Sequence, residues 1–116
     1  MDDMRRQALI LVGYIYLGCG KTEKAVSLLE AARAKAPGDP YLCRALSFAY
    51  IRTGRYERAL GEAEKCLAGL KAAPQDRRCA LLLKAHALWG LGRETERKRT
   101  VEELFALGAR TESAHE

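Results

Sequence analysis

The sequence lacks the residue pairs that build metal sites and disulfide frameworks. Its four cysteines, Cys19, Cys43, Cys66 and Cys79, form no C-x-x-C pair, and its two histidines stand at no metal-ligand spacing from them. The local sequence therefore offers no zinc site. Because the cysteines mostly lie within apolar helical patterns, we expect reduced thiols that are small core residues or half-exposed, as in cytosolic proteins.

Motifs of catalysis are also missing. The chain has no glycine-rich phosphate loop, no nucleophile elbow, no H-E-x-x-H helix and no pair of carboxylates on an apolar face. We therefore predict a protein that is not an enzyme and that needs no cofactor and no metal.

Blocks of like charge are absent, although the net charge is +5. The short basic run Arg97-Lys98-Arg99 has acidic neighbours at Glu94 and Glu96 and no interleaved aromatic residue. Such a pattern is typical of a solvated helix face with ion pairs three or four residues apart. It does not indicate a nucleic-acid surface.

No hydrophobic run is long enough to cross a bilayer. Arg5 and Arg6 precede the apolar stretch LILVGYIYLGCG, which raises the alternative of a secretory or lipoprotein leader. The apolar part is only about a dozen residues long, whereas a spanning helix needs about 20. Tyr16 also stands where a lipoprotein signal usually has leucine. We interpret the stretch as a core helix of a cytoplasmic protein that does not insert into a membrane.

What the sequence does contain is an internal repeat. Gly20, Gly54 and Gly92 each follow an apolar segment, 34 and 38 residues apart. The segments that start at these glycines are similar: GKTEKAVSLLEAA, GRYERALGEAEKC and GRETERKRTVEEL. A period of 34 is the length of a tetratricopeptide repeat (TPR), which is a helix-turn-helix unit.

The residue pattern of the TPR can be read around the same glycines. The first repeat has Leu9-x-x-Val12-Gly13-x-x-Tyr16, Ala25-x-x-x-Leu29 and Pro37, and the second has Cys43-x-x-Leu46-Ser47-x-x-Tyr50 and Ala59-x-x-x-Ala63. The third, Leu81-x-x-Lys84-Ala85-x-x-Leu88, is degenerate, with Arg97 where a small residue belongs. Gly13, Ser47 and Ala85 are small because the two helices of a repeat cross there. The glycine after each first helix permits a left-handed turn.

The sequence therefore predicts an all-α fold, a three-repeat TPR solenoid. Its six helices are expected at residues 5–18, 22–35, 40–52, 56–70, 76–90 and 94–107. The TPR domain is predicted over residues 1–108, with repeats at about 6–39, 40–73 and 78–108, followed by a polar, frayed tail over 109–116. No polar capping helix is recognisable, so we expect apolar surface that a partner covers.

Helical spacing also predicts a concave groove. In stacked TPRs the first helix of each repeat lines this face, around the small crossing residue. The predicted partner-binding residues are Ile10, Tyr14, Leu17, Tyr41, Arg44, Phe48, Ile51, Arg52, Leu82, His86 and Trp89. This aromatic and aliphatic surface suits an apolar helix or an extended segment. We expect His86 to be a polar spot and not a catalyst, and Phe48 and Trp89 could instead pack inside the solenoid.

One kind of TPR ligand is excluded by the groove residues. TPR co-chaperones that grip the acidic C-termini of heat-shock chaperones use a carboxylate clamp of Lys and Asn on the first helices. The matching positions here are Ile10, Tyr14, Arg44 and Phe48, so the clamp is absent.

With three TPRs in a chain of this length and a first helix at the N-terminus, the sequence resembles the small export chaperones of bacterial type III secretion, above all the YscY type. The similarity is clearest over residues 6–37, where GYIYLGCGKTEKAVSLLEAARAKAP joins an aromatic-rich first helix, a Cys-Gly turn and an alanine-rich second helix. The resemblance implies a cytoplasmic chaperone that forms a 1:1 heterodimer with a small secreted partner of the YscX type and engages the export gate. The alternatives are a TPR chaperone of the needle subunit and a stand-alone TPR scaffold or regulator.

Overall fold

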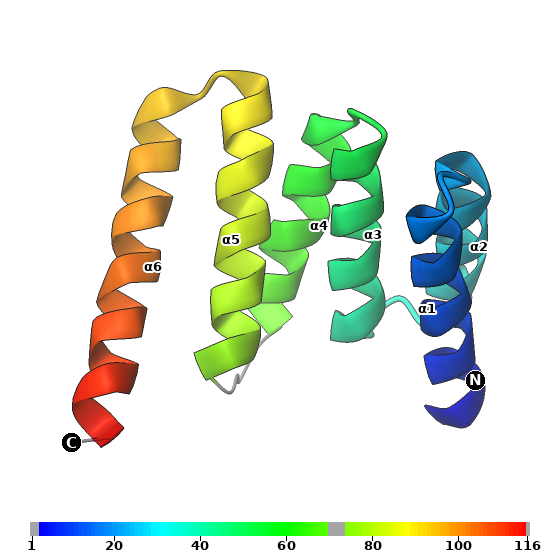
Figure 1. The fold of residues 1–116 in the computed structure, drawn as a ribbon, viewed down its shortest axis with the longest axis horizontal. Helices are drawn as coiled ribbons and strands as arrows, with labels where there is room; N and C mark the ends of the chain where they lie inside the picture. Colours follow the sequence, from blue (N-terminus) through cyan, green and yellow to red (C-terminus); the bar gives the residue numbers. More distant parts are fainter. Residues whose placement is uncertain (1–2, 70–73, 116) are drawn as a thin grey trace.

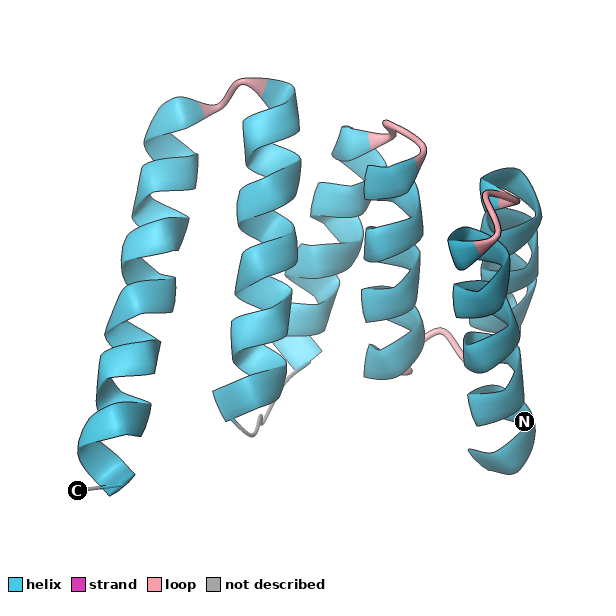
Figure 2. Cartoon of the chain, in the orientation of Figure 1, coloured by secondary structure: helices cyan, strands magenta, loops and turns pink. Residues whose placement is uncertain are grey.

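Six helices form the fold, and the structure shows no strand within residues 3–69 and 74–115 (Figures 1 and 2). The computed structural model describes these two ranges, with side chains over 4–69 and 74–108. The helices are α1 (Asp3–Gly18), α2 (Thr22–Lys35), α3 (Pro40–Arg52), α4 (Tyr56–Gly69), α5 (Pro74–Leu91) and α6 (Glu94–His115). They stand side by side as three helical hairpins, which confirms the predicted all-α TPR solenoid.

Each hairpin turns at a glycine in the left-handed region of the backbone. Gly20, Gly54 and Gly92 have φ angles of 78°, 75° and 73°. The residue after each glycine donates its N–H to the carbonyl five residues earlier, as Lys21 does to Tyr16 at 2.8 Å. Residues with a Cβ rarely adopt such a φ, so the recurrence of glycine at these turns has a conformational cause. The predicted turn geometry is confirmed.

Asp39 joins the first hairpin to the second. Pro40 begins α3, where its missing N–H costs no hydrogen bond. One oxygen of the Asp39 carboxylate accepts hydrogen bonds from the N–H groups of Tyr41 and Leu42 at 2.9 and 3.4 Å. The other oxygen pairs with Nε of Arg6 in α1 at 3.0 Å. The same carboxylate therefore caps α3 and fixes it against α1.

Small residues lie where the two helices of a hairpin cross, as predicted. A Cβ atom on Gly13 would lie 3.0 Å from Cδ2 of Leu29 in α2. In the second hairpin Ser47 is fully buried, and its hydroxyl donates to the carbonyl of Ala59 in α4 at 2.9 Å. Neither crossing has room for a longer side chain, because protein cores are close-packed.

Ion pairs at equivalent positions join successive hairpins. Arg55, just after the second glycine turn, pairs with Glu23 of α2 at 2.8 Å. Arg93, just after the third turn, pairs with Glu57 of α4 at 3.2 Å. The two glutamates are largely exposed to water, so the pairs contribute little to stability. They nevertheless mark a common register in which each hairpin stacks on the one before it.

The core runs along the inside of the stack. Its largest fully buried aliphatic side chains are Leu29, Leu42, Leu46, Leu81 and Leu88. Within the part of the chain that the structure describes, α6 packs on α5 alone, whereas α3 contacts α1, α2, α4 and α5. Each hairpin therefore depends on its immediate neighbours, as in other solenoids.

Three helix ends differ from the prediction by two residues or more, and one of them is the start of α1, at Asp3 where residue 5 was expected. We expected the last helix to end near residue 107 and a frayed tail over 109–116, but α6 continues to His115. No proline follows Gly108, and alanine, arginine and glutamate among the next residues favour helix. Helix α5 begins at Pro74, two residues before the predicted start at 76. Residues 70–73, where the second predicted repeat ends, lie outside the described residues.

Candidate functional site

The first helices of the three hairpins, α1, α3 and α5, line the same side of the solenoid, with α2 and α4 behind them (Figure 1). Helix α3 contacts both α1 and α5. Two hollows open among their side chains. The first lies between α1 and α3 and is called the α1–α3 groove. The second lies between α5 and α6 and is called the α5–α6 hollow.

The α1–α3 groove gathers residues from two repeats. Its volume is about 390 Å³, and it is lined by Arg6, Gln7, Ile10, Leu11, Tyr14, Tyr41 and Arg44. The structure thus brings together four of the predicted residues, Ile10, Tyr14, Tyr41 and Arg44. The prediction omits Arg6, although this residue lies one helical turn before Ile10 and so on the same face of α1. That spacing was the signal that could have found it.

Tyr41 lies between two arginines at the end of this groove. The guanidinium carbons of Arg6 and Arg44 stand 5.5 and 5.1 Å from the centre of its ring, within the range of cation–π attraction. Asp39 pairs with Arg6, and Asp76 of α5 pairs with Arg44 at 3.0 Å. Burial lowers the pKa of Arg44, but the hydrogen bond to Asp76 and its charge outweigh burial, so the net pKa is raised. The groove thus ends in two arginines that carboxylates hold in place and whose charges these carboxylates offset.

Tyr14, which lines the α1–α3 groove, packs against an aromatic ring of α3. The rings of Tyr14 and Phe48 stand 6.0 Å apart at an angle of 54°, a tilted geometry that aromatic pairs favour. Burial raises the pKa of the Tyr14 hydroxyl, although the charge of Arg44 opposes this. The hydroxyl therefore stays protonated at neutral pH and can donate a hydrogen bond to a ligand.

The α5–α6 hollow contains the predicted residues of the third repeat. Its volume is about 280 Å³, and it is lined by Leu82, Ala85, His86, Trp89, Arg97 and Val101. Trp89 is 68% exposed, and its ring stands 6.2 Å from that of His86. Arg97 holds the position that Ala25 holds in the first repeat, so a long side chain borders the hollow where a small one would allow close packing. These residues line a hollow of their own and share no lining residue with the α1–α3 groove.

The remaining predicted residues line neither of the two hollows. Leu17 is a correction, because it is 2% exposed and belongs to the core. It follows Gly13 by one helical turn and therefore points toward the same buried side of α1. Phe48 and Ile51 are half-buried and pack against the core, whereas Arg52 is exposed. The alternative prediction was that the rings of Phe48 and Trp89 pack inside the solenoid. It is confirmed in part for Phe48 and is wrong for Trp89.

The four cysteines are free, as predicted, and they divide into two classes. Cys43 and Cys66 are buried, whereas Cys19 and Cys79 are exposed. Burial raises the pKa of both inner thiols, and neighbouring arginines offset this only in part. A higher pKa leaves less thiolate at a given pH, and the thiolate is the reactive form.

A thiol reagent should therefore distinguish the two classes. At neutral pH we expect two thiols, Cys19 and Cys79, to react rapidly in the native protein, because they are exposed and the other two are not. All four should react after denaturation without prior reduction. The measurement is the absorbance of the released chromophore. Fewer than four thiols in denatured, unreduced protein would reveal a disulfide and contradict the prediction.

Other kinds of site find no support in the described residues. Residues 4–69 and 74–108, whose side chains the structure describes, contain no group of three or more His, Cys, Asp or Glu side chains that could hold a metal ion. Within the same ranges, none of the helices combines the length and the apolar character that crossing a membrane requires.

Comparison with known families agrees with this architecture. The profile of the tetratricopeptide repeat family matches residues 16–87, which is more than half of the chain. The match runs from the end of α1 into α5 and includes two of the three glycine turns. No curated protein gives a significant match. The helical hairpins, the left-handed glycine turns, the small crossing residues and the family match together show that the chain belongs to the tetratricopeptide repeat family.

Proposed function

We propose that the protein is a cytoplasmic chaperone of bacterial type III secretion, of the YscY type, which binds and stabilises a small secreted partner of the YscX type. TPR repeats serve in protein–protein interaction, so the coarser role follows from the family. The observation that carries the proposal is the α1–α3 groove. There, open apolar and aromatic side chains lie beside two arginines held by carboxylates.

Binding would rest on burial of apolar side chains of the partner. Ile10 and Tyr14 offer aliphatic and aromatic surface, and Arg44 offers a positive charge to an acidic residue of the partner. Leu82 and Trp89 offer a second anchoring point in the α5–α6 hollow. Large aromatic residues and arginine are the side chains that most often dominate binding energy at interfaces. Such a chaperone would need neither ATP nor covalent chemistry.

Residues at the carboxylate-clamp positions support an apolar ligand over an acidic C-terminus. Ile10 and Tyr14 occupy two of those positions and leave no lysine or asparagine there. We propose a 1:1 heterodimer, which would then engage the export gate. A needle-subunit chaperone and a stand-alone TPR scaffold differ from this proposal in the partner that they would retain.

Co-expression with candidate secreted proteins from the same locus tests the proposal. Expressed alone, the chain should self-associate or aggregate, because large apolar side chains such as Trp89 and Leu82 are exposed. With its partner it should elute as a soluble 1:1 complex, with the mass measured by light scattering. A stable monomer without any partner would contradict the prediction. Capture of a needle subunit, or of no secreted protein, would favour one of the two alternatives.

A further inference from the structure

The outer side of α1 resembles a surface that α3 buries. The N-terminal stacking face consists of Met4, Ala8, Leu11, Val12 and Ile15. The residues 34 positions after the last four are Leu42, Ala45, Leu46 and Ala49 of α3. These four are at most 1% exposed, whereas Leu11, Val12 and Ile15 are 61%, 37% and 53% exposed. Helix α1 therefore presents to solvent the side that α3 packs against the preceding hairpin.

Helix α2 shows what kind of helix fits such a face. It contacts α3 through a buried apolar side that includes Val26. Two of its glutamates, two helical turns apart, make polar contacts with the second hairpin. We call this interface between the two hairpins the joint. Glu23 pairs with Arg55 at 2.8 Å, and Glu30 accepts a hydrogen bond from the Tyr50 hydroxyl at 3.1 Å. The joint thus combines apolar burial with two acidic residues at a spacing of seven.

The first repeat has matching residues on the side that would receive such a helix. Lys21 stands 34 positions before Arg55, and Tyr16 stands 34 positions before Tyr50. One position differs. In the second repeat the buried Glu62 pairs with Arg33 of α2 at 3.0 Å, whereas the first repeat has Leu28 at that position. A helix that binds the first repeat should therefore carry an apolar residue where α2 carries Arg33.

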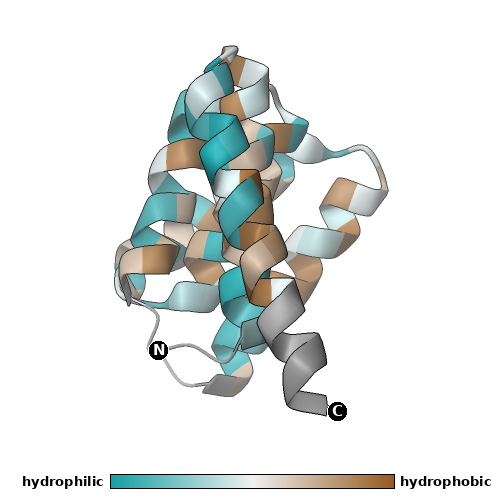
Figure 3. Cartoon of the chain, turned by 90° about the vertical axis from the view of Figure 1, so that its left-hand side faces the viewer, coloured by the Kyte–Doolittle hydropathy of each residue, from teal (hydrophilic) through white to brown (hydrophobic). Residues whose placement is uncertain are grey.

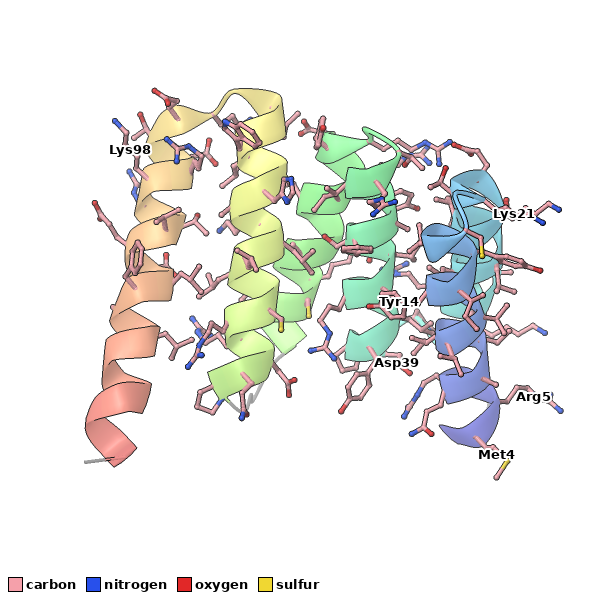
Figure 4. All side chains as sticks on the ribbon, in the orientation of Figure 1. Met4, Arg5, Tyr14, Lys21, Asp39 and Lys98 are labelled. Carbon is pink, nitrogen blue, oxygen red and sulfur yellow. The ribbon has the colours of Figure 1, made fainter. Side chains whose placement is uncertain are left out.

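Charge around the N-terminal stacking face favours acidic residues in the partner. Arg5 and Lys35 border a hollow of about 290 Å³ with Leu28, and Lys24, together with Glu23, borders another one on the same hairpin. Figure 4 shows Met4, Arg5 and Lys21 on the α1–α2 end of the solenoid, with the Lys21 side chain pointing away from α3. Apolar surface edged by cations matches an amphipathic helix with acidic flanks.

A second copy of this chain does not supply such a helix. Its α2 is already covered by its own α3. The corresponding surface of α6 has Lys98, 72 residues after Val26, and Lys98 lies at the opposite end of the solenoid from Met4 (Figure 4). The first turns of α6 are mainly hydrophilic in Figure 3. Packing Lys98 on Val12 and Ile15 would bury an unpaired charge, which is costly.

We propose that the N-terminal stacking face binds an amphipathic helix of another protein in the way that α3 binds α2. An acidic residue near the start of that helix faces Lys21, and a second one, two turns later, accepts a hydrogen bond from Tyr16. Apolar residues between them cover Val12 and Ile15, and a further apolar residue covers Leu28. This surface shares only Leu11 with the lining of the α1–α3 groove, so the inference goes beyond the proposed function and does not depend on it.

A peptide copied from α2 tests the proposal. The probe is a fluorescent peptide of residues 21–36 with Arg33→Leu, and the comparison peptide keeps Arg33. Binding to the full chain is followed by fluorescence anisotropy. We expect the Arg33→Leu peptide to bind at least about 5-fold more tightly, because Leu28 stands where Arg33 would need a carboxylate. No binding of either peptide, or equal affinity of the two, would overturn the proposal.

Variants of the chain then locate the bound peptide. Ile15→Glu should weaken binding at least about 10-fold, whereas the control Phe105→Glu, at an exposed apolar residue of α6, should leave it unchanged. Lys21→Glu should also weaken binding, and Glu23→Lys in the peptide should restore it. This charge exchange decides the matter even if Ile15→Glu fails to fold. Normal binding by Ile15→Glu, loss of binding only with Tyr14→Ala, or dissociation of a homodimer by Ile15→Glu would refute the proposal.

Discussion

Replacement of Gly13 by leucine should unfold the first hairpin. A Cβ at this position would already lie 3.0 and 3.1 Å from Cδ2 and Cγ of Leu29, and leucine adds three more carbons. Leu29 is fully buried, and close-packed protein cores leave little space into which a side chain can turn. Overpacking a core typically costs about 1–3 kcal/mol and occasionally more. We expect a loss of about 3 kcal/mol or more, with α1 displaced from α2, measured by urea denaturation followed by circular dichroism.

Gly18 provides the matched control on the same helix. No atom lies within 4 Å of a Cβ built there, and the residue is exposed at the end of α1. Because leucine favours helix over glycine, Gly18→Leu should leave the urea midpoint unchanged or raise it slightly. An unchanged midpoint for Gly13→Leu would mean that α1 and α2 do not cross closely at this position.

Removal of one aromatic side chain from the α1–α3 groove or from the α5–α6 hollow should weaken partner binding about 30-fold or more. Trp89→Ala tests the α5–α6 hollow, and Tyr14→Ala tests the α1–α3 groove. Truncation of an aromatic anchor at an interface often costs about 2 kcal/mol or more, which corresponds to this factor. Trp89 is largely exposed, so helicity should be preserved. The measurement is the affinity for the secreted partner by calorimetry, with circular dichroism of each variant.

Phe48→Ala is expected to act differently. We expect a similar loss of affinity, but Phe48 also packs against the core, so its truncation should lower the stability of the fold as well. Normal binding by Tyr14→Ala, Phe48→Ala and Trp89→Ala would place the partner on the convex side or at an end of the solenoid. Loss of helical signal in Trp89→Ala would instead assign that ring to the core.

The fold could be predicted because its signals are local. Gly20 and Gly54 mark left-handed turns, and Pro40 marks the start of a helix, so α2 and α3 begin and end at the predicted residues. Gly13 and Ser47 mark the crossings through their small size alone. Each of these features follows from the conformational or steric property of one residue type. The end of α6 lacked such a signal, and there the predicted boundary was wrong.

The candidate site was predicted only in part, because exposure depends on the next hairpin. Leu17, Ile51 and Trp89 occupy the same position in successive repeats and were therefore assigned the same role. In the structure Leu17 is buried, Ile51 is half-buried and Trp89 is 68% exposed. The position is covered where another hairpin follows, as α3 follows the first one, and open at α5, which no further hairpin follows in the described residues. Helical spacing within one repeat contains no information on this.

The linear order of contacts gives the molecule an uneven resistance to local opening. Detaching α6 breaks its packing on one helix, whereas releasing α3 breaks its packing on four. Regions with few tertiary contacts open at low free energy, and densely contacted ones open only with global unfolding. The backbone amides of α3 should thus exchange with solvent most slowly, and those of α6 among the fastest. A ligand held at one end of the solenoid would slow amide exchange there first, while the centre, already the most protected part, would change little.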